Sequence, residues 1–270
     1  MARADHGETG SVAMDDGCRI AYRLDGDPTA PVLLLSNSLG TNMEMWAPQM
    51  ALFSARRRVL RYDSRGHGAS DAPLGGYSMG RLGRDAIGLL DAIGVERVDF
   101  CGLSMGGMVG QWLGHRAPQR LRRLILANTS AYMGPPSGWQ SRIDKVMKEG
   151  VASIADAVIE RWVTPEFVAG HADIVAAVRD QLLATSARGY AGCCAAIRDM
   201  DMRPVGRLID VVTLVIGGTR DPATPPSHAE HLARSIPGAR LAILDAAHLS
   251  NVERPSMFGR AVSRFLEDLA

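Results

Sequence analysis

The sequence predicts an α/β fold, in which a mostly parallel eight-stranded sheet carries helices on both faces. Two observations lead to this prediction. Six short apolar runs, each consistent with a buried strand, alternate with stretches of helical hydrophobic spacing. Near the amino terminus, two alternating segments flank the turn sequence DDG at 15–17 and predict an antiparallel hairpin. A chain of 270 residues can bury a core of this size.

The predicted elements follow one another in a regular order. The two hairpin strands lie near Ser11–Met14 and Cys18–Arg23. The apolar runs predict strands at Pro31–Ser36, Arg58–Tyr62, Arg97–Cys101, Leu121–Ala127, Val211–Ile216 and Arg240–Leu244. Helical spacing predicts helices at Met45–Phe53, Ser78–Ile93, Met105–Ala117, Ser227–Ser235 and Ser256–Leu269.

The alternation of strands and helices stops between Gly134 and Arg207. We expect a helical cap (lid) at 134–207, inserted into an α/β core formed by residues 1–133 and 208–270. Because ligands bind at the carboxyl ends of parallel strands, a cap at this point covers the active site. The alternative is that this helical segment only packs against the core, far from the active site. The predicted cap helices are Gly138–Lys148, Ala152–Trp162, Ala172–Ser186 and Gly189–Met200.

Charge and composition exclude several classes of partner. The formal net charge of +1 gives no field that attracts nucleic acid or an anionic membrane. The first ten residues are polar, and no apolar run approaches the roughly 20 residues that span a bilayer. The four cysteines show no metal-ligand or disulfide spacing, which favours buried thiols in a reducing compartment. We expect a cytoplasmic protein with no cofactor and no metal, and a homo-oligomer is compatible with the sequence.

The pentapeptide Gly102–Gly106, with the sequence GLSMG, carries the main functional signal. It follows an apolar strand pattern and opens a helical one, which is the context of a nucleophile on a sharp strand-to-helix turn. Such a turn brings chain segments so close together that the flanking positions must be small, and Gly102 and Gly106 meet this demand. The pattern predicts that Ser104 is the nucleophile of a serine hydrolase.

A serine nucleophile needs a base within hydrogen-bond reach and an acid that orients the base. His248 follows the last predicted strand, where a loop can return it to the edge of the sheet. Asp221 follows the preceding strand, so the chain order Ser104, Asp221, His248 fits a Ser-His-Asp triad. Asp245 is the rival acid, although it stands close to His248 in the chain. A turn residue before Pro222 is the purely structural interpretation of Asp221.

An oxyanion hole requires two backbone N–H groups directed at the negative charge that develops on the substrate. The residue after the nucleophile, Met105, supplies the first. The second is expected from the loop after the first strand beyond the hairpin, at 36–41.

Five motifs and the amino-terminal hairpin together point to one family. The motifs are LSNSLGT at Leu35–Thr41, YDSRGHG at Tyr62–Gly68, GLSMGG at Gly102–Gly107, GTRD at Gly218–Asp221 and HLSN at His248–Asn251. They closely resemble the α/β-hydrolase fold family over nearly the whole chain. This resemblance implies that Leu39, at the position that follows His-Gly in many related enzymes, is the second oxyanion donor; its side chain is also expected to form a wall of the pocket.

A narrower resemblance is to the 3-oxoadipate enol-lactonases, hydrolases of the β-ketoadipate route of bacterial aromatic catabolism. It rests on Asn37-Ser38 in place of the common His-Gly and on the segment YAGCCAAIRDMD at 190–201. The resemblance implies a small anionic lactone as the substrate. A carboxylate on that lactone needs a polar partner, and the candidates in the predicted cap are Trp139, Arg142, Trp162 and Arg188.

Other functions remain open at this point. A carboxylesterase, a carbon–carbon hydrolase of ring-cleavage products and a cofactor-free perhydrolase use the same three residues. A hydrolase-fold ligand receptor with slow turnover is an alternative of a different class.

Overall fold

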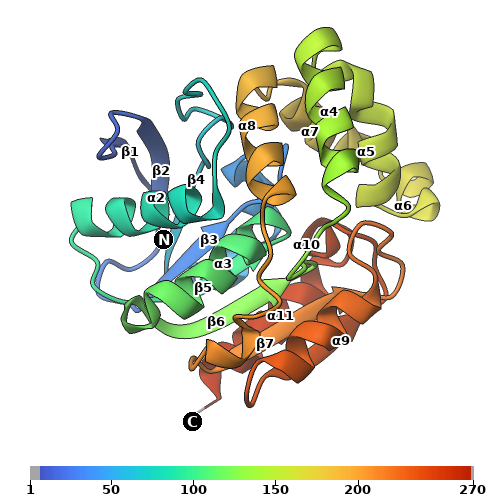
Figure 1. The fold of residues 1–270 in the computed structure, drawn as a ribbon. Coiled ribbons are helices and arrows are strands. Elements are labelled where there is room, and N and C mark those ends of the chain that lie inside the picture. Colours follow the sequence, from blue (N-terminus) through green and yellow to red (C-terminus); the bar gives the residue numbers. More distant parts are fainter. Residues whose placement is uncertain (1–6, 269–270) are drawn as a thin grey trace.

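The computed structural model describes residues 7–268 and contains one eight-stranded sheet (Figure 1). The strand order is β1-β2-β4-β3-β5-β6-β7-β8. The first hairpin and the β2–β4 pair are antiparallel, and all the other pairs are parallel. This arrangement confirms the predicted fold class. The strands are β1 Glu8–Ala13, β2 Arg19–Asp25, β3 Val32–Ser36, β4 Arg58–Tyr62, β5 Val98–Leu103, β6 Leu121–Ala127, β7 Thr213–Gly218 and β8 Arg240–Leu244.

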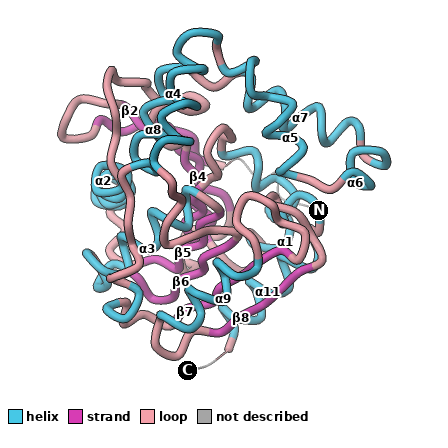
Figure 2. Tube along the Cα trace, turned by 45° about the vertical axis from the view of Figure 1, so that its right-hand side comes forward, coloured by secondary structure: helices cyan, strands magenta, loops and turns pink. Residues whose placement is uncertain are grey.

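Helices cover both faces of the sheet, as predicted. Helices α2, Met79–Ala92, α3, Met105–Arg116, and α9, Pro226–Ser235, lie on one face. Helices α1, Ala47–Phe53, and α11, Pro255–Glu267, lie on the other (Figure 2). The helix predicted at Ser256–Leu269 is observed as α11, which begins at Pro255; the end predicted at Leu269 lies outside the described residues. A short helix that was not predicted, α10, Ser250–Glu253, precedes it. Short 3-10 helices occupy Met43–Trp46, Pro118–Arg120, Val151–Ile154 and Gly206–Leu208.

Burial along the strands explains their composition. Every residue of β3, β5 and β7 is buried, because helices pack on both sides of these central strands. The edge strand β8 is largely open, and its Leu241 and Ile243 are exposed. All four cysteines are free and buried. None of the helices in the described part of the chain is long and apolar enough to cross a membrane.

The interval between β6 and β7 is helical, with five α-helices where four were predicted. They lie above the sheet in Figure 1. The additional helix, α6, begins because Thr164 caps it and Pro165 occupies its first position. These helices, which we call the helical insertion, are α4 Pro136–Glu149, α5 Ala155–Trp162, α6 Pro165–Gly170, α7 Ala172–Leu183 and α8 Ala187–Arg198.

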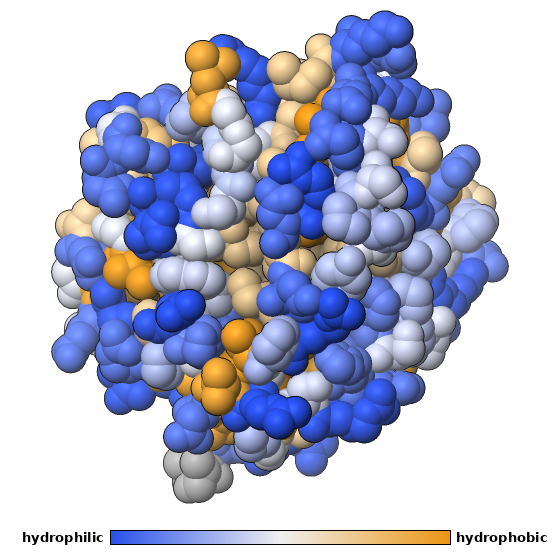
Figure 3. Space-filling view, in the orientation of Figure 1, coloured by the Kyte–Doolittle hydropathy of each residue, from blue (hydrophilic) through white to orange (hydrophobic). Residues whose placement is uncertain are grey.

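The helical insertion contacts the core at several places, including Gly189 and the end of α5. Gly66 and Gly189 approach so closely that a Cβ on either one would collide with the other residue's backbone. At the end of α5, the carbonyl of Trp162 accepts a hydrogen bond from the backbone N–H of Leu249, at 2.8 Å. The outer surface on the side seen in Figure 3 is mostly hydrophilic, with small separate hydrophobic patches.

Candidate active site

Ser104 occupies a sharp turn between β5 and α3. Its backbone has a φ of 56° and a ψ of −115°, a conformation that non-glycine residues rarely adopt. A Cβ on Gly102 would collide with the carbonyl of Gly106, and one on Gly106 would collide with the carbonyl of Ser36. The turn therefore requires glycine at both flanking positions, as the sequence predicted.

The side chains of Ser104, His248 and Asp221 form one hydrogen-bonded chain. The Nε2 atom of His248 lies 2.9 Å from the Oγ of Ser104, and its Nδ1 lies 2.8 Å from the Oδ2 of Asp221. The three residues come from the segments that follow β5, β8 and β7, which end at the same edge of the sheet. Ser104 is 8% exposed and His248 is 4% exposed. These side chains are therefore shielded from bulk solvent but reachable from the cavity described below.

Asp221 is held as an ionised carboxylate. Burial raises its pKa, but the charge of His248 and the hydrogen bonds from His248, Asn128 and Thr224 outweigh burial and lower the pKa to about 2. Its Oδ2 accepts from the Nδ2 of Asn128 at 3.0 Å and from the Oγ1 of Thr224 at 2.7 Å. The rival Asp245 instead accepts from the Oγ1 of Thr219 at 3.2 Å, at an exposed position. The structure therefore brings Asp221, and not Asp245, to the histidine.

Two backbone N–H groups beside Ser104 are free. Within residues 7–268, the N–H groups of Leu39 and Met105 have no hydrogen-bond partner. The neighbouring N–H groups are all used: Gly106 donates to the Asn37 carbonyl at 3.0 Å, and Gly40 donates to the Nε2 of His67 at 2.9 Å. The two free groups are the ones predicted to form the oxyanion hole.

Asn37, which replaces the common histidine, supports this loop from behind. Its side-chain N–H₂ donates to the Tyr62 carbonyl at 2.8 Å, and its side-chain oxygen accepts from the indole N–H of Trp46 at 2.9 Å. Asn37 is fully buried. Its amide therefore fixes the path of the loop.

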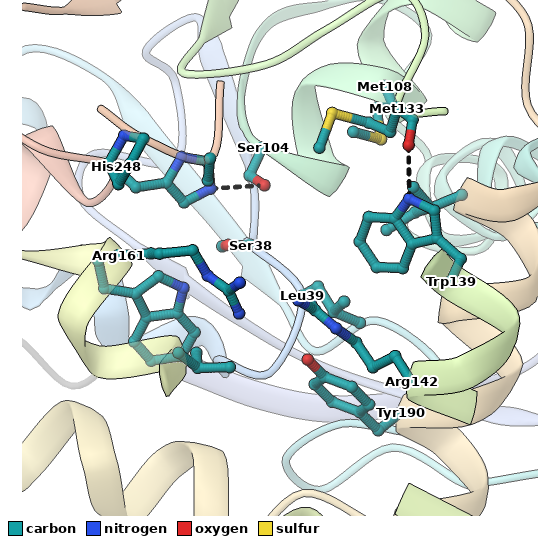
Figure 4. Close-up of a pocket in the computed structure, with 15 residues that line it drawn as sticks. Ser38, Leu39, Ser104, Met108, Met133, Trp139, Arg142, Arg161, Tyr190 and His248 are labelled. Atoms are coloured by element: carbon teal, nitrogen blue, oxygen red, sulfur yellow. Dashed lines mark hydrogen bonds between the residues drawn. The ribbon is translucent and has the colours of Figure 1, made fainter. Parts of the chain in front are cut away.

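A cavity of about 200 Å³ opens over Ser104 between the sheet and the helical insertion (Figure 4). Its wall combines apolar side chains with two guanidinium groups. Among the described residues, no cluster of His, Cys, Asp or Glu could hold a metal ion. The lining residues are Ser38, Leu39, Ser104, Met108, Met133, Trp139, Arg142, Val158, Arg161, Trp162, Tyr190, Ile197, Pro222, Ala223 and His248.

Arg142 and Arg161 direct positive charge into this cavity. Figure 4 shows both side chains converging on its middle, near Leu39. In the part of the chain that the structure describes, neither forms an ion pair with a carboxylate; Arg142 stacks on Trp139 with its guanidinium carbon 4.9 Å from the ring centre. Burial and the like charge of Arg142 lower the pKa of Arg161. An anion bound between the two groups would relieve both effects.

Comparison with known proteins identifies the family. A model of the alpha/beta hydrolase family matches residues 32–261. The chain is an α/β hydrolase. The 3-oxoadipate enol-lactonase 2 of Acinetobacter baylyi is 42% identical to this hydrolase over 246 residues, which make up 91% of this chain and 92% of that protein.

Two solved structures resemble the hydrolase closely. A hydrolase from Pseudomonas aeruginosa is 47% identical, with a TM-score of 0.95 over 97% of this chain and 100% of that one. The enol-lactonase from Burkholderia xenovorans is 44% identical, with a TM-score of 0.94 over 96% and 100%. These relatives confirm the predicted resemblance and the predicted class of enzyme, a carboxylic ester hydrolase.

The structure shows which of the four residues predicted to bind a substrate carboxylate line the cavity of the hydrolase. Trp139, Arg142 and Trp162 line the cavity, but the indole N–H of Trp139 donates to the Met133 carbonyl at 2.7 Å and is not available. The fourth candidate, Arg188, does not line this cavity; it borders a separate groove on another side of α8.

The sequence analysis missed Arg161 and Tyr190. Arg161 was detectable: with Val158 and Trp162 it has the spacing i, i+3, i+4 that puts three residues on one face of a helix. An arginine within such an apolar face is unusual and marks a charge that faces the interior. Tyr190 had no comparable signal, because its helix is buried along most of its length.

His67 of the hydrolase supports the loop at 36–41 that carries Leu39. Because Gly40 can only donate, the Nε2 of His67 accepts, and its Nδ1–H donates to the Arg65 carbonyl at 3.2 Å. His67 is fully buried, and burial lowers its pKa from 6.5 to about 4. The imidazole is therefore neutral in the folded protein at neutral pH.

This shift predicts how stability depends on pH. Between about pH 6.5 and 4 the unfolded chain binds a proton at His67 and the folded protein does not, so stability falls as the pH falls through this window. From pH 7.5 to 5 we expect His67 to account for about 2 kcal/mol of lost unfolding free energy. Urea unfolding of wild type and His67→Gln at both pH values measures this share. The exposed His171→Gln variant is the control, and an equal loss in wild type and His67→Gln would contradict the assignment.

Proposed function

We propose that the protein is a serine hydrolase that opens 3-oxoadipate enol-lactone to 3-oxoadipate, in the β-ketoadipate route of aromatic degradation. The observation that carries this proposal is the pair Arg142 and Arg161, unpaired with any carboxylate of the described chain, in a cavity of about 200 Å³ next to Ser104. A cavity of this size and charge suits a small ester that carries a carboxylate. The name of the Acinetobacter relative, 3-oxoadipate enol-lactonase 2, supports the same substrate, and the name of the Burkholderia relative supports an enol-lactone.

In the proposed mechanism, the Oγ of Ser104 attacks the lactone carbonyl while the Nε2 of His248 takes its proton. The carbonyl π electrons move onto oxygen, and the N–H groups of Leu39 and Met105 stabilise the resulting oxyanion. Asp221 holds the imidazole through Nδ1 and stabilises its charged form. Each oxyanion donor lowers the barrier by about 3 kcal/mol.

Collapse of the tetrahedral intermediate breaks the bond between the carbonyl carbon and the ring oxygen. The ring oxygen leaves as an enolate, takes the proton from His248 and becomes an enol, while the acyl group stays on Ser104. The enol then tautomerises to a ketone, which disfavours ring closure. His248 next removes a proton from water, which attacks the acyl carbon and forms a second tetrahedral intermediate. Its collapse breaks the bond between that carbon and the Oγ of Ser104, Oγ takes the proton back from His248, and 3-oxoadipate is released.

We also propose that residues 134–207 act as a cap (lid) domain on the core formed by 1–133 and 208–270. Most of the apolar wall opposite Ser104 comes from the helical insertion, including Val158, Trp162 and Ile197. The hydrogen bond from Leu249 to the Trp162 carbonyl ties this wall to the loop that carries His248. This contact supports a cap that shapes the substrate pocket.

The two arginines give a test of substrate charge. We expect Arg161→Met and Arg142→Met each to lower kcat/KM for 3-oxoadipate enol-lactone by roughly 10²-fold, mostly through KM, because a hydrogen bond to a charged group contributes about 1.5–3 kcal/mol. Hydrolysis of the neutral p-nitrophenyl acetate should change less than about 3-fold. Steady-state kinetics of both variants on both substrates measure the difference.

Arg188→Met is the matched control, since it removes the same charge from the same helical insertion outside the cavity. It should behave like wild type on both substrates. An equal loss on the charged lactone and the neutral ester in the two cavity variants would argue for a general packing role and against the anion site.

A further inference from the structure

The hydroxyl of Ser38 is a polar group in the cavity that the mechanism above does not use. Ser38 is 1% exposed and lines the cavity next to Leu39. Its backbone is turned away: the N–H donates to the sulfur of Met45 at 3.3 Å, and the carbonyl accepts from the N–H and Oγ1 of Thr41 at 3.3 and 2.9 Å. Within the described residues its Oγ forms no hydrogen bond, and it is not one of the fully enclosed polar atoms, so it is accessible from the cavity that Ser38 lines.

The Ser38 hydroxyl lies on the same side of the cavity as the catalytic serine and histidine. Figure 4 shows Ser38 between the ring of His248 and Leu39, on the side of the cavity where Ser104 projects. A buried hydroxyl without a partner is unfavourable, and such groups are normally satisfied. The loop is also held rigidly, because Asn37 and Gly40 on either side are fixed by hydrogen bonds to buried groups. A rigid, unpartnered donor at this point is organised for a substrate.

We propose that the Ser38 hydroxyl is a third oxyanion donor, beside the N–H groups of Leu39 and Met105. It would donate to the substrate carbonyl oxygen as that oxygen gains negative charge. No covalent bond to Ser38 changes: the proton of Ser104 goes to His248, the carbonyl electron pair goes to oxygen, and Ser38 keeps its proton. This inference rests on the proposed serine mechanism and adds a catalytic residue to it.

Ser38→Ala removes the donor and keeps the Cβ that packs in the loop. We expect kcat to fall by about 10²-fold on 3-oxoadipate enol-lactone and on p-nitrophenyl acetate alike, with KM changed less than about 3-fold, because both substrates form an oxyanion. A boronic acid that forms a tetrahedral adduct on Ser104 should bind more weakly by a similar factor. The matched control is Ser36→Ala, which deletes a buried hydroxyl bonded to Tyr62, at 2.8 Å, outside the cavity.

Each outcome decides one point. Two results would overturn the proposal that Ser38 is a third oxyanion donor. Ser38→Ala could keep more than half of the wild-type kcat, or it could raise only KM and only for the charged lactone. If circular dichroism shows that Ser38→Ala does not fold, Ser38→Gly is the second variant, because it removes the same hydroxyl together with the Cβ. The same loss of kcat and of boronate affinity is expected for it. If wild type hydrolyses neither substrate, the proposed function itself fails, which is a result distinct from unchanged kcat in the variant.

Discussion

Replacing Ser104 with alanine is expected to lower kcat for ester hydrolysis by about 10⁶-fold and to leave the fold intact. Only the hydroxyl group is lost, and without it His248 has no nucleophile to activate. The decrease in kcat should therefore equal the decrease caused by removing the whole triad. The change keeps the Cβ and leaves the backbone hydrogen bond from the Ser104 N–H to the Ala127 carbonyl available. Single-turnover and steady-state assays, with circular dichroism for the fold, measure the two expectations.

The control for this variant is Ser235→Ala, which removes a hydroxyl on α9, remote from the cavity. It should retain full activity. If Ser104→Ala kept a substantial fraction of wild-type turnover on either ester, another group would have to be the nucleophile and the assignment of Ser104 would be wrong.

Asp221→Asn is expected to lower kcat by about 10⁴-fold. The amide is neutral and does not stabilise the imidazolium, and its N–H₂ favours the tautomer of His248 that cannot accept a proton at Nε2. Asp221 also accepts hydrogen bonds from the backbone N–H groups of Ala223 and Thr224, at 2.8 and 2.9 Å, and an amide has one acceptor oxygen where the carboxylate has two. The variant should therefore also lose about 1–3 kcal/mol of stability.

Kinetics and urea unfolding test both effects, and the comparison variant is Asp245→Asn. Asp245 lies closer to His248 in the sequence, but it is exposed and faces Thr219. It should keep wild-type activity and stability. The reverse ranking of the two variants would make Asp245 the orienting acid.

The sequence predicted those parts of the site that local chain geometry determines. The turn at Ser104 needs glycine on both sides, and a nucleophile, an acid and a histidine that follow different parallel strands must meet at one edge of the sheet. The free N–H group of Met105 follows from the same geometry, because Met105 directly follows the serine and begins α3. The choice of Leu39 came instead from the resemblance to the α/β hydrolases.

The parts that sequence reasoning missed depend on how the helical insertion packs. The spacing of Arg161 with Val158 and Trp162 indicated the face of α5 on which it lies, but which way that face turns depends on how α5 packs. The same holds for Arg188 on α8. The use of the Trp139 indole by the Met133 carbonyl depends on a contact at the start of the helical insertion. His67 and Ser38 appeared only as motif residues in the sequence. The hydrogen bond from Gly40 shows what His67 does, and the cavity shows where the Ser38 hydroxyl is directed.

The most direct test of the central claim is a comparison of the lactone with its methyl ester, which lacks the negative charge. The measurement is wild-type kcat/KM for ring opening of 3-oxoadipate enol-lactone and of the same lactone with its side-chain carboxylate as a methyl ester. Because Arg142 and Arg161 line the cavity and form no ion pair with a carboxylate of residues 7–268, we expect the charged lactone to be preferred by about 10²-fold or more, and the preference to fall with rising salt. Equal values for the two lactones, or failure to open the charged one, would contradict an enol-lactonase selective for an anionic substrate.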